Sequence, residues 1–337
     1  MQSNDYALVI GINDYPSYRP LRGAIRDAQA VAEWLRSPVH GGALPAENVS
    51  TIVSTSNPPV PLQDQVDDAL REILAAARAS GGRRFYFYFS GHGFSSDVAH
   101  DVVLCLAKWS EELRHLALSS NRYQDLLVRS GIFSEIVFFL DCCRIWKVRA
   151  AGQKPYIDVV SPGFAASGAR VFVAYGAGFD SYAMEAGSCG DATDSGEFRG
   201  IFTEALLSGL RGAAATERGE VTATSLKHYL EVATPRLAAN KGFEQRAEVL
   251  NGLPSAPEPI FGRASPMGKL VIQFHKHRSG QVILEGPFFE CLRRGDATTG
   301  PWEIDLPRGL YRLMETATGQ GMILEYARDT EVTHVYF

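Results

Sequence analysis

Two uninterrupted apolar segments constrain the fold of this chain most strongly. Residues 84–89 (RFYFYF) carry an aromatic side chain at every position after the first, and residues 136–140 (IVFFL) are wholly apolar. A strand that is apolar on both faces must be covered on both, as central strands of parallel sheets are. Similar short runs at 6–10, 49–53 and 169–175 predict three further strands.

Helical periodicity alternates with these strands. From Ala24, apolar residues recur every three or four positions until the pattern fades at Ser37. We expect further helices over residues 66–79, 198–210 and 224–237. Because alternating strands and helices require right-handed crossover connections, the sequence predicts an α/β fold, with a mostly parallel sheet flanked by helices on both faces.

The pattern changes in the last quarter of the chain. Residues 251–266 are rich in Pro, Gly and Ser, which is typical of a linker. Evenly spaced strand-like runs follow, as in a small antiparallel sandwich. We therefore predict an α/β domain over 1–255, a linker over 256–267 and a small C-terminal all-β domain over 268–337, which would bind or regulate.

Composition excludes several classes of function. A net charge of -5 argues against binding to nucleic acid, which needs a surplus of Lys and Arg. The chain has neither an apolar run long enough for a membrane span nor a basic segment typical of a signal peptide, so we expect an intact cytoplasmic protein without membrane contact. Its five cysteines lack paired spacings, which favours reduced thiols and no metal site.

Residues that could take part in catalysis follow the two most apolar strands. Ser90-Gly91-His92-Gly93 comes directly after the first, and Asp141-Cys142-Cys143-Arg144 after the second. Carboxyl ends of parallel strands meet at one edge of a sheet, so His92 and a cysteine would lie close together. An imidazole can take a proton from a thiol and later return it to a leaving amine. Taken singly, each residue has a structural alternative: an exposed loop histidine, or a cysteine that fills the core.

Five motifs in order make the chain resemble the caspase and metacaspase superfamily of cysteine peptidases (clan CD, peptidase C14-like), and most nearly its bacterial metacaspase-like members. The resemblance spans about residues 5–255 and rests on YALVIGINDYPSY with LRGAIRDA, YFYFSGHGF, IVFFLDCCR, VFVAYGAGFDSYAMEAG and GIFTEALLSGL. It implies a caspase-like fold with His92 and Cys143 as the catalytic dyad. It also implies an oxyanion hole formed by the amides of Gly93 and Cys143. Cys142 takes the small-residue position before the nucleophile.

The resemblance also implies the preferred residue before the scissile bond (P1). Caspases that cut after aspartate take an arginine from an S-W-R segment, but this chain reads Ser181-Tyr182-Ala183 there. Metacaspases instead line the P1 pocket with residues that match Asp27, Ser90 and Asp141, and Asp180 is a further candidate. Charge complementarity then favours a basic P1 residue, Arg over Lys.

Alternatives remain for some of these residues. Asp27 could brace its own helix, and Asp180 could be a solvated loop carboxylate. Arg26 and Arg144 lie in nearby segments, where we expect them to pair with acids at the surface.

Two departures from the family pattern carry further expectations. Where many metacaspases have calcium-binding acids, this chain reads Ala107-Lys108-Trp109, and Asp97 with Asp101 alone suggests a polar loop, which argues against calcium activation. Residues 144–161 form a basic segment after the nucleophile. An enzyme with an acidic pocket could cleave itself there, and the alternative is an uncut surface loop.

The sequence therefore predicts a cysteine endopeptidase that acts on protein substrates without a cofactor, awaits an activating protein partner, and serves a bacterial defence or cell-death pathway. Two rival hypotheses are a catalytically silent caspase-like scaffold that binds proteins, and a simple hydrolase or thiol transferase on the same sheet.

Overall fold

A computed structural model describes most of the chain, namely residues 4–38, 41–96, 98, 100–146, 152–158, 168–187, 198–216, 218–253, 258–263, 268–275, 279–286, 290–307, 309–326 and 332–337. The chain divides into two compact units. The first comprises Met1–Glu204 with Gln245–Ala256, and the second comprises Ala205–Glu244 with Pro257–Phe337. Each unit therefore contains two separate stretches of the sequence.

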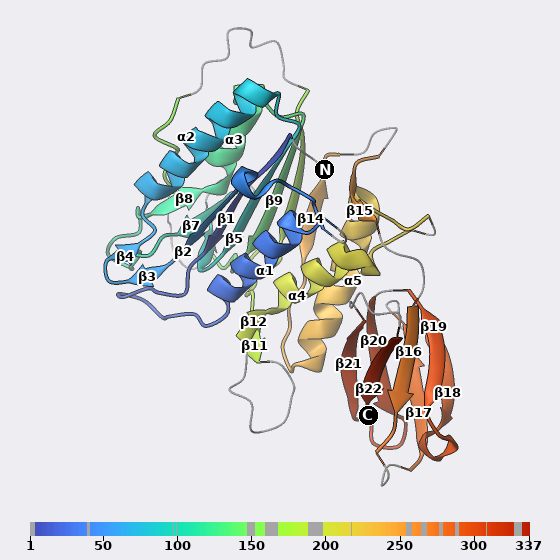
Figure 1. Cartoon of the computed structure of the whole chain (residues 1–337). Helices are drawn as coiled ribbons and strands as arrows, with labels where there is room; N and C mark the ends of the chain where they lie inside the picture. The colour runs from blue at the N-terminus through green and yellow to red at the C-terminus, as the bar shows by residue number, and fades with distance from the viewer. Residues whose placement is uncertain are drawn as a thin grey trace. The chain divides into compact units, whose positions relative to one another are not determined.

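Helices are interspersed with strands as far as α5, and the elements after α5 are strands apart from the short η3 (Figure 1). In chain order the elements are β1 (Asp5–Gly11), α1 (Ala24–Arg36), η1 (Ala46–Asn48), β2 (Val49–Val53), β3 (Thr55–Ser56), β4 (Pro59–Val60), α2 (Gln63–Ser80), β5 (Arg84–Ser90), β6 (Gly93–Ser95), β7 (Val102–Cys105), β8 (Ala117–Ser119), α3 (Ser120–Ser130), β9 (Glu135–Asp141), β10 (Arg170–Tyr175), β11 (Glu185–Gly187), β12 (Phe198–Gly200), α4 (Ile201–Ser208), η2 (Gly209–Ala213), β13 (Glu220–Thr222), α5 (Ala223–Asn240), β14 (Glu248–Asn251), β15 (Ile260–Arg263), β16 (Gly268–Gln273), β17 (Gln281–Glu285), β18 (Cys291–Asp296), η3 (Ala297–Thr299), β19 (Trp302–Leu306), β20 (Gly309–Glu315), β21 (Gly321–Tyr326) and β22 (Val332–Tyr336).

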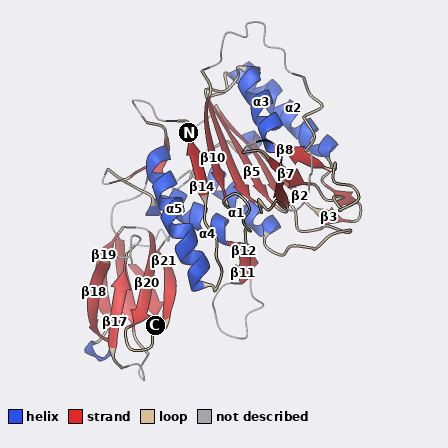
Figure 2. Cartoon of the chain, turned by 180° about the vertical axis from the view of Figure 1, so that it is seen from behind, coloured by secondary structure: helices blue, strands red, loops and turns tan. Residues whose placement is uncertain are grey.

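The first unit is built on a six-stranded sheet with the order β14-β10-β9-β5-β1-β2. Neighbouring strands run parallel, except that the edge strand β14 is antiparallel to β10. Figures 1 and 2 show α2 and α3 together on one face and α1 on the other. The predicted mostly parallel sheet with helices on both faces is confirmed.

The aromatic strand β5 lies in the middle of this sheet, and all of its residues are buried. Phe87 packs with Leu8 and Phe138 in the core beneath α2 and α3. Tyr86 points to the opposite face, where its ring lies 6.2 Å from that of Trp34 in α1. Because both faces are covered, alternating polarity is absent from the strand, as expected for a central parallel strand.

Helix α3 was not predicted from the sequence, although its ends carry recognisable signals. The Ser119 hydroxyl accepts a hydrogen bond from the amide of Arg122 at the N-terminus, and Gly131 ends the helix with a positive φ of 63°. Four of its eleven residues are apolar, namely Tyr123, Leu126, Leu127 and Val128, so the apolar signal in the sequence is short. The helix predicted over 198–210 is also shorter than expected, because residues 198–200 form β12 and the helix begins at Ile201.

The second unit contains two sheets that enclose one apolar core. Their orders are β19-β16-β22 and β18-β17-β20-β21. The core includes Leu270, Val282, Trp302 and Leu313. The predicted all-β structure is confirmed, but it is not wholly antiparallel, since β16 and β22 run parallel. The spacing of strands along a sequence does not determine which strands become neighbours.

Two further segments differ from the sequence expectation. The predicted linker over 256–267 contains β15, which pairs antiparallel with β13. Its Pro and Gly content hid the apolar Ile260 and Phe261. Strand β18 was not expected, because it is an edge strand with four exposed residues at its start and few apolar side chains.

Candidate functional site

The two segments that carry His92 and Cys143 leave the sheet side by side. Strands β5 and β9 are neighbours, and the register pairs Ser90 with Asp141 at their carboxyl ends. The amide of Gly91 donates to the carbonyl of Asp141 at 3.3 Å. His92 and Cys143 each follow this pair by two residues, so both emerge at the same edge of the sheet.

A glycine allows the two segments to approach closely. A Cβ atom added to Gly93 would lie 2.6 Å from the Sγ atom of Cys142 and 2.9 Å from the carbonyl oxygen of Cys143. Any larger residue at position 93 would therefore push the histidine segment away from the cysteine segment.

Aromatic rings and one carbonyl oxygen hold the His92 side chain. Its ring centroid lies 4.7 Å from that of Tyr15 and 4.9 Å from that of Tyr18. Its main-chain amide donates to the Tyr15 hydroxyl at 2.9 Å, and its Nε2 atom lies 2.7 Å from the carbonyl oxygen of Arg19. Because a carbonyl oxygen only accepts, Nε2 carries the proton and Nδ1 has a lone pair. Burial lowers the pKa of His92 below its usual value, which favours the neutral ring.

Backbone atoms surround the thiol of Cys143. Its Sγ atom lies 3.5 Å from the carbonyl oxygen of Ala183 and accepts a hydrogen bond from the amide of Ala183 at 3.4 Å. Burial raises the pKa of Cys143 to about 11. The resting side chain is therefore a neutral thiol, and a base must take its proton before the sulfur can attack. The neighbouring Cys142 is buried in the core of the unit.

Two buried carboxyl groups lie under this edge of the sheet. Asp27 accepts a hydrogen bond from the amide of Gly200 at 2.7 Å, and Asp141 accepts from the amide and hydroxyl of Thr203 at 3.1 and 2.6 Å. A Cβ atom on Gly200 would collide with Asp141 and lie 2.9 Å from Asp27, so one glycine touches both acids. Ser90 is also buried here, beside Asp141 in the sheet register. Three of the four predicted pocket residues are thus brought together.

Burial dominates the electrostatics of both acids. It raises the pKa of Asp141 to about 6 despite the opposing hydrogen bonds from Thr203. The pKa of Asp27 is raised well above its usual value, first by burial and then by the negative charge of Asp141. Two desolvated carboxylates repel each other, so a positive charge placed between them would be strongly stabilised.

The raised pKa makes a prediction for stability. The folded protein binds the Asp141 proton more tightly than the unfolded chain, so this stabilisation is fully present below the unfolded pKa of 3.8 and is lost as the pH rises through about 6. The free energy of unfolding of Asp141→Asn, relative to that of the wild type, should therefore rise by on the order of 2 to 3 kcal/mol from pH 4 to pH 8. Urea unfolding at both pH values measures this difference. An equal difference at the two pH values would contradict the assignment.

Asp180 does not join the other predicted pocket residues. Its carboxylate accepts a hydrogen bond from the amide of Trp146 at 2.9 Å, which fixes the loop after the cysteine. Asp180 is an exposed loop residue, and its carboxylate has this specific backbone partner in addition to solvent. Among the residues that the structure describes, no hydrogen bond links Asp180 with Asp27 or Asp141.

Arg144 was expected at the surface, but it is buried. Its guanidinium lies 4.0 Å from the ring centroid of Tyr175 and forms an ion pair with Glu248 of β14. In the segment 144–161, where self-cleavage was predicted, residues 147–151 and 159–161 lie outside the described residues. The carbonyl of Lys154 accepts a hydrogen bond from Gln63 at 2.7 Å, so its backbone is tied to α2.

Sequence reasoning missed residues that join the two sides of the site. Glu185 accepts hydrogen bonds from the amides of Arg22 and Gly23 at 2.9 and 3.0 Å. It thereby connects β11 to the loop that carries the Arg19 carbonyl. Gln245 accepts from the amide of Met184 at 2.8 Å. These three hydrogen bonds each span more than 60 residues of sequence, and no local pattern could have indicated them.

Asp101, one of the two acids considered for calcium, has a structural role. Its Oδ1 atom accepts hydrogen bonds from the hydroxyls of Ser119 and Ser120 and from the amide of Asn121, at the start of α3. Asp97 lies outside the described residues. Among the residues that are described, no three His, Cys, Asp or Glu side chains gather as a metal site would require. Nor does any described helix have the length and hydropathy needed to cross a membrane.

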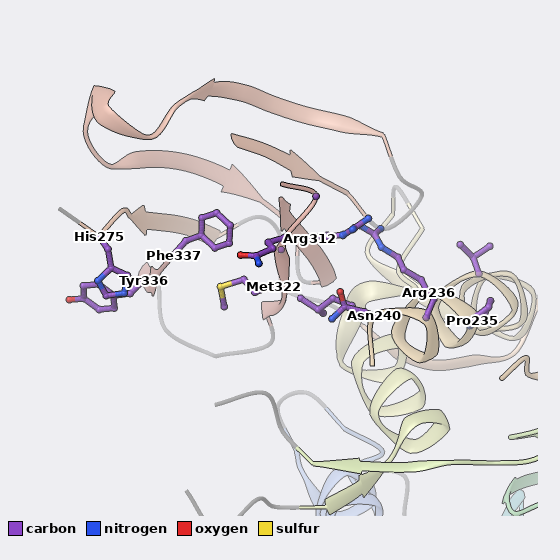
Figure 3. A pocket seen from close by; sticks show the side chains of 14 residues that line it. Pro235, Arg236, Asn240, His275, Arg312, Met322, Tyr336 and Phe337 are labelled. Atoms are coloured by element: carbon purple, nitrogen blue, oxygen red, sulfur yellow. The ribbon is translucent and has the colours of Figure 1, made fainter. Parts of the chain in front are cut away.

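The second unit contains a large cavity. It has a volume of about 970 Å³ and is lined by α5 and by residues of the C-terminal sheets (Figure 3). Arg236 and Arg312 both line it, and both lie within ion-pair distance of Glu285. Their charges are therefore partly neutralised within the protein.

Comparisons with known proteins agree with the fold. The family model for the caspase domain matches residues 4–254. A probable protease from a Desulfuromonadales bacterium is 33% identical over 223 residues, which cover 62% of this chain and 26% of that protein. The chain thus spans about a quarter of the length of this relative.

A solved structure gives independent support for the fold. The crystal structure of caspase-1 from Spodoptera frugiperda aligns with a TM-score of 0.50 and 12% identity, over 77% of this chain and 92% of that chain. The match of the family model extends over most of the chain and includes both β5 and β9 with the segments that follow them. The chain therefore belongs to the caspase-domain family of cysteine peptidases.

Proposed function

We propose that the chain is a cysteine endopeptidase that cleaves proteins after a basic P1 residue, with Arg preferred over Lys, and that Cys143 and His92 form its dyad. The observation that carries the proposal is the pair of buried acids, Asp27 and Asp141, beside the segment that holds Cys143. Arg199 lies 3.8 Å from Asp27, and among the described residues no cation forms an ion pair with Asp141, so a substrate cation would supply a further partner for the two acids.

The reaction would begin with proton transfer from the Cys143 thiol to Nδ1 of His92. The sulfur then attacks the carbonyl carbon of the scissile bond, and the resulting oxyanion accepts hydrogen bonds from the amides of Gly93 and Cys143. Collapse of this intermediate breaks the C–N bond, and His92 gives its proton to the leaving amine. Water, deprotonated by His92, then hydrolyses the thioester and restores the thiol.

The preference for Arg follows from the geometry of its side chain. A guanidinium presents five N–H donors in one plane and can bind two carboxylates at once, whereas a lysine ammonium is a compact point charge. A Cβ atom on Gly200 would collide with an oxygen of Asp141 and lie 2.9 Å from an oxygen of Asp27, so the two carboxylates are close enough to share one guanidinium.

The wider role belongs to the same proposal and rests on the family resemblance. We propose a cytoplasmic enzyme that needs no cofactor, is restrained until an activating protein partner binds, and acts in a bacterial defence or cell-death pathway. The neutral thiol of Cys143, held between backbone atoms of Ala183, is consistent with a restrained resting state.

A panel of four fluorogenic peptides, identical except for Arg, Lys, citrulline or Asp at P1, tests the proposal. We expect cleavage after Arg to be several-fold faster than after Lys and at least about 100-fold faster than after citrulline, which has nearly the shape of Arg without its charge. The assay is run with calcium and with a chelator. Preferred cleavage after Asp would contradict the acidic pocket. Failure to cleave any peptide would point either to the silent scaffold or to an activating partner that the assay lacks.

A further inference from the structure

Two large aromatic side chains are exposed close to the candidate nucleophile. Trp146 and Phe179, called here the aromatic pair, are 48% and 60% exposed, and their ring centroids lie 6.2 Å apart. The other three tryptophans of the chain, Trp34, Trp109 and Trp302, are at most 2% exposed. Exposed apolar surface is costly in water, and where it is contiguous it commonly marks a binding site.

The aromatic pair is mounted on a fixed backbone. The amide of Arg144 donates to the carbonyl of Ser181, and the amide of Asp180 donates to the carbonyl of Arg144, both at 2.9 Å. The carboxylate of Asp180 in turn accepts from the amide of Trp146. Asp180 has a φ of 55°, a conformation that non-glycine residues seldom adopt. These bonds therefore hold the two aromatic residues in place before any ligand binds.

Both residues of the aromatic pair lie a few positions away, along the sequence, from residues of the candidate active site. Trp146 follows Cys143 by three residues, and Phe179 precedes Ala183 by four. Ala183 is the residue whose amide and carbonyl contact the Cys143 sulfur. A peptide extended across this sulfur would therefore bring neighbouring side chains within reach of both rings.

We propose that the aromatic pair is a substrate subsite that binds an apolar side chain, aliphatic or aromatic, next to the basic P1 residue. The proposal deepens the proposed peptidase function and rests on it. Two rings tilted by 46° offer apolar surface to such a side chain, and this surface would be removed from water on binding. The pocket acids would then select for charge, and the aromatic pair for an adjacent apolar residue.

Tryptophan fluorescence provides the first test. Because Trp146 is the tryptophan that solvent reaches, its emission and its quenching by acrylamide report on this site. The Cys143→Ala variant is titrated with Arg-P1 peptides that have serine on both sides of Arg. In one peptide leucine replaces the serine directly before Arg, and in another it replaces the serine directly after Arg. At one of these positions, leucine should shift the emission to the blue, protect Trp146 from acrylamide and tighten binding about 10-fold.

The second test measures peptide cleavage by variants that keep Cys143. Phe179→Ala should remove about 10-fold in kcat/KM from the leucine peptide and little from the serine peptide. Tyr156→Ala is the matched control, because Tyr156 is an exposed aromatic residue whose amide is bonded to Asp67 of α2. Equal cleavage of the leucine and serine peptides would overturn the subsite and leave the P1 assignment standing. If the wild-type enzyme showed no preference for Arg over citrulline, the P1 assignment itself would be overturned.

Discussion

Replacing Cys143 with alanine should lower kcat/KM for an Arg-P1 peptide by at least about 10⁴-fold, because the loss of a nucleophile removes the covalent route altogether. Stability should change little, since the Cys143 side chain contacts only backbone atoms of Ala183 among the described hydrogen bonds. Steady-state kinetics and a thermal melt on the same preparation measure both quantities.

The adjacent cysteine provides a matched control. Cys142 is fully packed in the core, and its sulfur faces Gly93. Cys142→Ala should therefore cost about 1 kcal/mol of stability and leave kcat/KM within a few-fold of wild type. The reverse pattern, with activity lost in Cys142→Ala and kept in Cys143→Ala, would move the nucleophile to position 142.

The sheet could be predicted from the sequence because its strands carry their own signal. Strands β5 and β9 are apolar at nearly every position, and only a strand buried on both faces tolerates this composition. The same reasoning failed at α3, where four of eleven residues are apolar, and at β18, whose first four residues are exposed. Their existence depends on caps and on neighbouring strands.

The candidate site divides in the same way. His92 and Cys143 could be placed together from the order of strands and motifs, because parallel strands end at a common edge. For Asp180 the sequence left a pocket residue and a solvated loop carboxylate as alternatives, and it could not indicate the bond to the backbone amide of Trp146. The link from Glu185 to the amides of Arg22 and Gly23 joins segments that only the tertiary fold brings together.

Removing one acid of the buried pair should change specificity more than it changes the fold. For Asp141→Asn we expect kcat/KM with the Arg-P1 peptide to fall about 100-fold, because the guanidinium loses one of two charged acceptors in a desolvated site. The citrulline peptide carries no charge, so its cleavage should change by only a few-fold. The ratio of the two rates isolates the charge of the pocket from any general loss of activity.

The pH dependence of this ratio provides a further check on the same assignment. Since the pKa of Asp141 is raised to about 6, lowering the pH through 6 protonates the acid and should reduce the ratio of Arg to citrulline cleavage in the wild type. In Asp141→Asn this titration is absent, and the ratio should respond less to pH. The same decline in variant and wild type would assign the titration to another group. Because titration of His92 affects both peptides alike, it cancels in the ratio, and any change in the ratio comes from groups that contact the P1 side chain.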